Sequence, residues 1–85
     1  MWGLNNLNKP KYDINVIPVW ENYTTGNPDV IVSVVDNGVE IKHEDLADNC
    51  LKSGHYNSVD GTSAIYPGDH GTHVAGTIAA VGNNG

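Results

Sequence analysis

The sequence predicts an α/β protein built on a parallel sheet, and three segments carry this prediction. Residues 30–35 read Val-Ile-Val-Ser-Val-Val, a β-branched and almost entirely apolar run typical of a parallel strand covered on both faces. Residues 55–59 are a second, shorter strand candidate, and residues 70–81 predict a helix. Two strands do not make a finished sheet, so we expect further chain to complete the fold.

The chain ahead of the first strand predicts an extended arm followed by one short helix. Residues 2–11 are polar and rich in asparagine. Apolar residues then recur over 12–23, where Asp13 is a candidate N-cap and Pro18 disfavours a helix interior. Residues 24–29, Thr-Thr-Gly-Asn-Pro-Asp, predict a turn.

The predicted helix over 70–81 is rich in small residues. Asp69 stands where an N-cap would. Gly71 and Gly76 each cost about 1 kcal/mol relative to alanine inside a helix. We expect close packing of the helix backbone against another segment to offset this cost. Residues 39–49, earlier in the chain, predict a loop with one helical turn.

Composition argues against several classes of partner. The 85 residues make one domain at most, and four lysines with no arginine face ten acidic residues, for a net charge of -6. Nucleic acids and anionic membrane surfaces attract clusters of Lys and Arg, so neither is a predicted partner. No apolar run approaches the ~20 residues that span a bilayer. The first residues lack the pattern of a signal peptide, and the single Cys50 cannot form an internal disulfide.

Asp36 and His70 are the residues that point to chemistry. Asp36 directly follows the buried strand, where the functional groups of open α/β sheets gather. His70 stands at a helix start from which it can reach back to that carboxylate. An Asp–His hydrogen bond fixes the imidazole tautomer and stabilises the imidazolium, as a general base requires. The plainer alternatives are a turn aspartate and a capping or core histidine.

A metal site is a competing interpretation of the same helix. His73 lies three residues after His70 on one helix face, and Asp69 could supply a third ligand. The pair lacks the His-Glu-x-x-His form of the zinc proteases, and no other segment has ligand spacing. A small zinc hydrolase built on His70 and His73 is therefore kept as an alternative.

Two motifs resemble those of the subtilisin-like serine proteases, the subtilases. Residues 30–38, which end in Asp36-Asn-Gly, resemble the strand and aspartate motif of that family. Residues 70–77, His-Gly-Thr-His-Val-Ala-Gly-Thr, resemble its histidine motif over eight consecutive positions. The order matches the Asp, His, Ser order of subtilisin. The resemblance covers nearly the whole chain and leans toward the kexin-like branch, which usually has a second acid where Asn37 stands.

The resemblance implies that residues 1–85 are the N-terminal fragment of a subtilase catalytic domain. The implied fold is the subtilisin-like three-layer α/β fold, with a parallel sheet and helices on both faces, incomplete in this chain. His70 would be the general base, Asp36 would orient it, and the serine nucleophile would lie downstream. The implied substrate is a polypeptide, the implied partner is the remainder of the catalytic domain, and the implied location is secreted or extracytoplasmic.

The resemblance also implies a structural calcium site. In many subtilases, the aspartate that matches Asp45 shares a calcium ion with the loop after the histidine helix. Here that loop offers the Val81 carbonyl and the Asn83 side chain, and oxygen ligands of these kinds suit calcium. The alternative is a plain solvated Asp45. The peptidase chemistry itself requires no cofactor.

Ser63 imitates the missing nucleophile. Residues 61–67 match the Gly-Thr-Ser-x-x-x-Pro signature of the subtilase serine, but that serine opens a long helix well after the histidine. Here the loop closes just before His70, so we do not expect Ser63 to act as nucleophile. The sequence predicts a serine endopeptidase represented by its Asp and His segments only, and the isolated chain is expected to hydrolyse nothing. The alternative is a non-catalytic pseudoprotease or a calcium-stabilised binding module.

Overall fold

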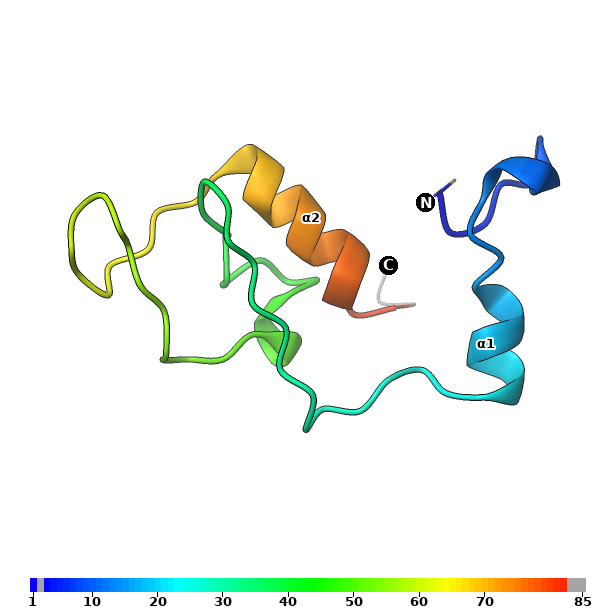
Figure 1. Ribbon diagram of the computed structural model, residues 1–85, viewed down its shortest axis with the longest axis horizontal. Helices are drawn as coiled ribbons and strands as arrows, with labels where there is room; N and C mark the ends of the chain where they lie inside the picture. The colour runs from blue at the N-terminus through cyan, green and yellow to red at the C-terminus, as the bar shows by residue number, and fades with distance from the viewer. Residues whose placement is uncertain (2, 83–85) are drawn as a thin grey trace. The chain divides into compact units, whose positions relative to one another are not determined.

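The computed structural model describes Met1 and residues 3–82 as short helices joined by loops (Figure 1). The helices are the 3₁₀-helix η1 (Pro10–Tyr12), the α-helix α1 (Ile17–Asn22), the 3₁₀-helix η2 (Ala47–Asn49) and the α-helix α2 (Asp69–Ala79). The chain divides into two compact units, one over Met1–Ile31 and one from Val32 onward. None of the described helices has the length and apolarity to cross a membrane.

Asp13 organises the first unit, although not as the predicted N-cap. One oxygen of its carboxylate accepts the N–H of Asn6 and the other accepts the N–H of Asn15, each at 2.8 Å. Helix α1 begins at Ile17 with Val16 as its N-cap residue and no capping side chain. The N-cap prediction is wrong because these two nearer backbone donors use both oxygens of the carboxylate.

The other predictions for the first unit have mixed outcomes. The extended arm is wrong over its described residues, because two N–H groups fold back onto the Met1 carbonyl at 3.0 and 3.2 Å and η1 follows. Pro18 lies in the first turn of α1, where its missing N–H costs nothing. The predicted turn is confirmed, since the side chains of Thr24 and Asn27 accept backbone N–H groups two residues on, at 2.9 and 2.8 Å.

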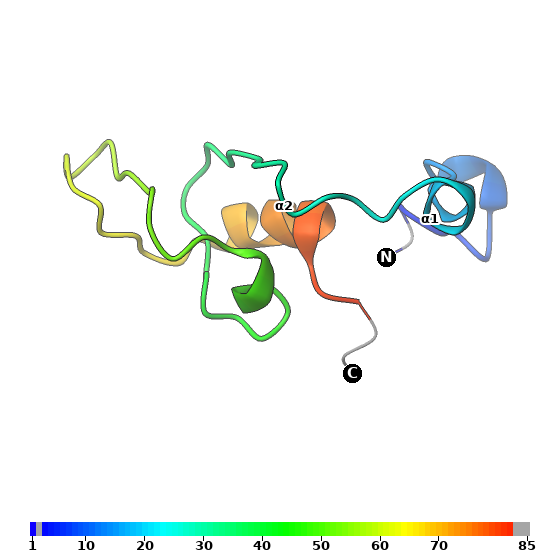
Figure 2. The same cartoon turned by 90° about the horizontal axis from the view of Figure 1, so that it is seen from below.

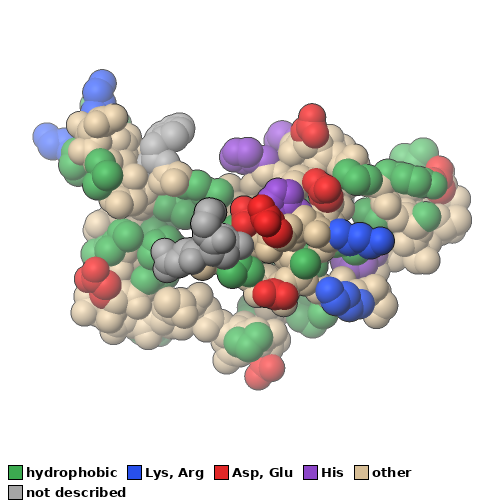
Figure 3. Space-filling model, turned by 180° about the vertical axis from the view of Figure 1, so that it is seen from behind, with side chains coloured by type: hydrophobic (Ala, Val, Ile, Leu, Met, Phe, Trp, Pro, Cys, Tyr) green, Lys and Arg blue, Asp and Glu red, His purple; other side chains and the backbone are tan. Residues whose placement is uncertain are grey.

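The predicted first strand is not formed in the described part of the chain. Residues 31–35 form no ladder with any described segment, and the parallel sheet is therefore absent from the described part of the chain. A strand needs the hydrogen bonds of a neighbour, and the apolar pattern alone does not provide one. Its large side chains are exposed: Val30 69%, Ile31 72%, Val32 57% and Val35 94%. Hydrophobic side chains lie open at several places on the face seen in Figure 3.

The predicted second strand, residues 55–59, is a turn instead. Asn57 pairs with Thr62 in an isolated antiparallel bridge, with the Asn57 N–H donating to the Thr62 carbonyl at 2.7 Å. The Asn57 side-chain oxygen accepts the N–H groups of Val59 and Asp60 at 3.0 and 3.1 Å. This Asn-centred turn competes with strand pairing, and it explains why the pattern was misleading here.

Helix α2 confirms the predicted helix over 70–81 with shifted ends. The N-cap residue is Gly68 rather than Asp69, which occupies the first helical position and has its carboxylate at the favourable end of the helix dipole. The helix ends at Ala79, two residues earlier than predicted, and the Ala80 N–H closes its last turn.

A loop packs along α2 in place of a sheet (Figure 2). The Glu40 N–H donates to the hydroxyl of Thr72 at 2.9 Å, near the start of the helix. The Asn49 side-chain amide donates to the carbonyl of Ala79 at 2.6 Å, at its end. These contacts fix the loop over the length of the helix, and the same loop begins with the Asp36 segment.

The core between this loop and α2 is small. Leu46 and Ala75 are the buried hydrophobic residues of the described chain, at 2% and 7% exposure. Leu46 is held by a helical turn in which the His43 carbonyl accepts the N–H groups of Leu46 and Ala47 at 2.9 and 2.8 Å. This turn and η2 confirm the helical turn predicted within residues 39–49.

Candidate active site

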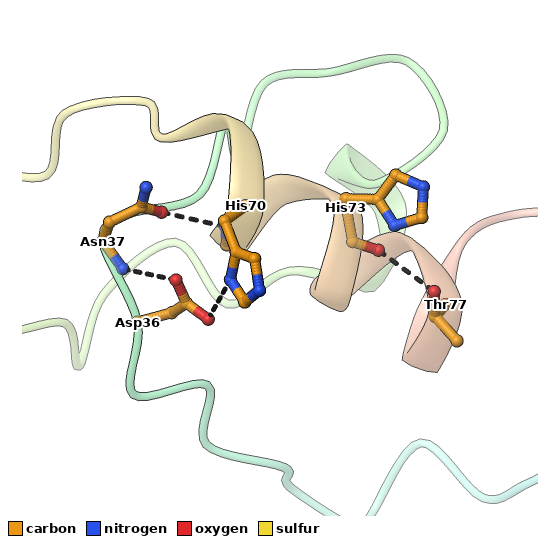
Figure 4. A network of polar contacts seen from close by, with 6 residues as sticks. Asp36, Asn37, His70, His73 and Thr77 are labelled. Carbon is orange, nitrogen blue, oxygen red and sulfur yellow. Dashed lines mark hydrogen bonds and ion pairs between the residues drawn. The ribbon is translucent and has the colours of Figure 1, made fainter.

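Asp36 and His70 are in contact although they are 34 residues apart (Figure 4). The His70 ring nitrogen Nδ1 lies 2.8 Å from the Asp36 carboxylate oxygen Oδ2. Asp36 directly follows the unpaired run of residues 30–35, and His70 is the second residue of α2. The Asp36 side chain is 17% exposed, whereas the His70 side chain is 74% exposed. One ring nitrogen is thus held by the carboxylate while the imidazole stays open to an incoming group.

The Asp36 carboxylate is held in its ionised form. The Asn37 N–H donates to Asp36 Oδ1 at 2.7 Å, and this bond is the main cause that lowers the pKa of Asp36 below its ordinary value of 3.8. Partial desolvation opposes the lowering, and the hydrogen bond and charge of His70 add to it. The resulting stability is present above the ordinary pKa and is lost as the pH falls through the lower folded value. Asp36 is therefore a carboxylate at neutral pH.

Glycine residues allow the loop that begins at Asp36, called the aspartate loop below, to lie close against the first turn of α2. A side chain at Gly71 would overlap the Gly38 carbonyl oxygen, and one at Gly68 would overlap the Asn37 side chain. Gly38 itself has φ +129, a conformation that other residues rarely adopt. The expected close backbone packing is thus present at Gly71, but not at Gly76, where no atom of another described segment lies within 4 Å of the position of a Cβ.

Sequence reasoning missed a third polar side chain in this site, that of Asn37. Its oxygen Oδ1 accepts the N–H of Gly71 at 2.9 Å. The sequence offered one signal for this contact, the Asn-Gly pair shortly after the strand-like segment. Such a pair predicts a turn, but it does not identify the N–H group that donates to the Asn side chain.

The alternative metal site is not assembled by the described residues. His73 is exposed one turn beyond His70, and its carbonyl accepts the Thr77 hydroxyl at 3.1 Å. No three His, Cys, Asp or Glu side chains of the described chain are grouped so that they could hold a metal ion.

Two of the three predicted calcium ligands lie side by side. The Val81 N–H donates to the Asp45 carbonyl at 2.6 Å, so the loop after α2 meets the Asp45 segment. Asn83 lies outside the described residues. The bond joins backbone groups and does not itself place the Asp45 carboxylate beside the Val81 carbonyl, although oxygen ligands of these kinds suit calcium.

Ser63 and Asp36 line different pockets of the described chain. Ser63 lines a pocket of about 490 Å³ together with Glu40 and His55, whereas Asp36 lines another of about 350 Å³. The residues that follow Ser63 are not helical before Asp69. It therefore lacks the helix that follows the subtilase nucleophile, in agreement with setting it aside.

The Asp–His pair defines a candidate general-base site, and the comparisons with known proteins identify its family. The model of the Subtilase family, Peptidase_S8, matches residues 27–85. The chain belongs to the subtilase family, as its motifs predicted.

Its relatives are of the kexin type. Proprotein convertase subtilisin/kexin type 7 of Mus musculus is 47% identical over an alignment of 90 residues, gaps included, that covers 98% of this chain and 12% of that protein. Kexin of Saccharomyces cerevisiae is 41% identical over an alignment of 88 residues, gaps included, that covers 98% of this chain and 11% of kexin. Furin-like protease 2 of Drosophila melanogaster is 38% identical over 98% of this chain and 5% of that protein. The chain thus spans about a tenth or less of these relatives' length, and no solved structure matches it.

Proposed function

We propose that this chain carries the base and its orienting acid for a serine endopeptidase. The observation that carries the proposal is the 2.8 Å contact between His70 Nδ1 and Asp36 Oδ2, on an imidazole whose side chain is 74% exposed. An imidazole held at one nitrogen by an ionised carboxylate can accept a proton at the other. The family supports this function, because several relatives are named endoproteases.

The proposed chemistry follows from these positions. His70 takes the proton of a serine hydroxyl as that oxygen attacks the carbonyl carbon of a peptide bond, and it then gives the proton to the leaving amine. The Asp36 carboxylate stabilises the imidazolium between the two transfers and keeps the proton of the neutral ring on Nδ1. The serine and the oxyanion donors come from the remainder of the catalytic domain.

The exposed apolar run supports the view that residues 1–85 are the N-terminal fragment of that domain. Val32 and Val35 are 57% and 94% exposed, although the run has the composition of a strand buried on both faces. Neighbouring strands of the remainder would pair with residues 30–35 and complete the three-layer α/β fold. The substrate of the complete enzyme is a polypeptide. A secreted or extracytoplasmic location agrees with the family resemblance.

Labelling with a fluorophosphonate tests the proposed function. The complete protease that contains this chain is expected to incorporate one equivalent at a serine outside residues 1–85 and to lose peptidase activity in step. The purified 85-residue chain is expected to incorporate none and to hydrolyse no peptide. A complete protein that does not label would point to the pseudoprotease alternative, and labelling at Ser63 would overturn the assignment of the nucleophile.

We also propose that Asp45, Val81 and Asn83 hold a structural calcium ion. The bond between the Val81 N–H and the Asp45 carbonyl supports this proposal, because it brings two of the three residues together. Chelation of calcium is expected to lower the melting temperature of the complete protease, and Asp45→Asn is expected to reduce that difference. A melting temperature that is insensitive to chelation in both proteins would contradict the site.

A further inference from the structure

We propose that Asn37 is a positioning residue, which sets the distance between Asp36 and His70 by capping helix α2 from the neighbouring loop. This inference rests on the proposed function, in which that distance determines the action of the base. Asn37 touches no reacting atom in the proposed chemistry, and it acts through the two residues that do.

The N-terminus of α2 lacks a local cap. The first N–H groups of a helix have no partner inside the helix, and the side chain of the N-cap residue usually accepts one of them. In α2 the N-cap residue is Gly68, which has no side chain. The N–H of Gly71, the third helical residue, instead donates to Asn37 Oδ1 at 2.9 Å. The acceptor is thus 34 residues away in sequence, next to Asp36.

This bond closes a ring with the Asp–His contact (Figure 4). Asp36 Oδ2 meets His70 Nδ1 at 2.8 Å, and Asp36 Oδ1 accepts the Asn37 N–H at 2.7 Å. Asn37 Oδ1 accepts the Gly71 N–H at 2.9 Å. The peptide bonds Asp36–Asn37 and His70–Gly71 join these contacts. Such a ring restricts both side chains more than the single Asp–His contact does.

The exposure of the His70 side chain explains why this ring of hydrogen bonds affects the position of the imidazole. The His70 side chain is 74% exposed, so little packing in the described chain holds its rotamer. Its position against the carboxylate therefore depends on where the first turn of α2 lies. Asn37 fixes that turn, and the glycine contacts at Gly38 and Gly71 allow the close approach.

Substitutions of Asn37 in the complete protease test this role. Asn37→Ala is expected to lower kcat about 10- to 100-fold with KM nearly unchanged, because a displacement of about 1 Å is enough for such a loss. Asn37→Asp keeps an acceptor oxygen in the same place and is expected to restore most of kcat. A matched control is Thr72→Val, which removes a different polar contact between this loop and the first half of α2, the one with the Glu40 N–H, and is expected to leave kcat nearly unchanged.

Nuclear magnetic resonance tests whether Asn37 holds the first turn of α2 and His70 in place, and it needs no peptidase activity. In the wild type and in Asn37→Asp, the Gly71 amide is expected to exchange slowly and the His70 Nδ1 proton to appear far downfield. In Asn37→Ala, the Gly71 amide is expected to exchange about tenfold faster or more, and the downfield proton is expected to be lost. These two signals support or refute the role of Asn37 even in a protein that fails to label with a fluorophosphonate.

Three results would overturn the inference. One is an Asn37→Ala protein that keeps Gly71 protection and kcat. Another is an Asn37→Asp protein as defective as Asn37→Ala, which would show that the acceptor oxygen is not the important group. The third is an equal loss of kcat in Thr72→Val, which would reduce Asn37 to a general stabiliser of the loop.

Discussion

Replacing His70 by alanine in the complete protease is expected to lower kcat about 10⁶-fold, because the serine hydroxyl then has no base to take its proton. The structure supports a specific loss of this kind, since Nδ1 of the ring is 2.8 Å from Asp36 and the side chain is mostly exposed. Removing an exposed side chain has little effect on packing, so the folded state is expected to persist. Hydrolysis of a fluorogenic peptide, with a melting curve for each protein, measures both properties.

His73→Ala is the matched control for His70→Ala. His73 is exposed on the same helix, one turn further on, and its ring points away from Asp36 in Figure 4. Its replacement is expected to leave kcat within about twofold, since its side chain takes no part in the proposed proton transfers. If both variants lost activity equally and added zinc restored neither, the His70–His73 metal alternative would gain support over the Asp–His pair.

Asp36→Asn refines the same prediction. The amide keeps the shape of the side chain but removes the charge and allows the wrong imidazole tautomer, so a loss of about 10⁴-fold in kcat is expected. Because the two residues act as a unit, the double variant Asp36→Asn/His70→Ala is expected to be no slower than His70→Ala alone. Losses that multiply in the double variant would show that the two side chains act independently.

The sequence predicted the parts of this site that depend on local pattern. The spacing of small and apolar residues after His70 predicted a helix, and α2 is present at Asp69–Ala79. The strand-like run ahead of Asp36 predicted a strand that delivers a carboxylate; the strand is not formed in the described chain, but the carboxylate at the end of the run does reach His70. The two motifs also predicted the subtilase family, which the family model confirms.

The sequence did not predict the features that depend on a distant partner. Residues 30–35 have strand chemistry, but a sheet exists only where another strand lies alongside, and the described chain supplies none. Asp69 and Asp13 both looked like N-caps, yet a cap is chosen by competition among the nearby acceptors and donors. Asn37 won that competition for the Gly71 N–H from a separate loop. No local pattern encodes such a choice.

Gly71→Ala is expected to lower the free energy of unfolding of the complete protease by about 2 kcal/mol. A methyl group there would overlap the Gly38 carbonyl oxygen, which belongs to backbone and cannot rotate away. Overpacking of this kind costs about 1–3 kcal/mol, and the better helix propensity of alanine returns about 1 kcal/mol. The obstacle is rigid, so the cost is expected at the upper end of the range. Urea unfolding measures the change.

Gly76→Ala, on the same helix, isolates the contact from helix propensity. Nothing in the described chain lies within 4 Å of the position that its methyl group would take. This variant is therefore expected to raise the free energy of unfolding by up to about 1 kcal/mol, the propensity gain alone. The two glycines then differ by about 3 kcal/mol for the same chemical change. Equal effects would show that the first turn of α2 does not rest on the aspartate loop, and the ring through Asp36, Asn37 and His70 would lose its support.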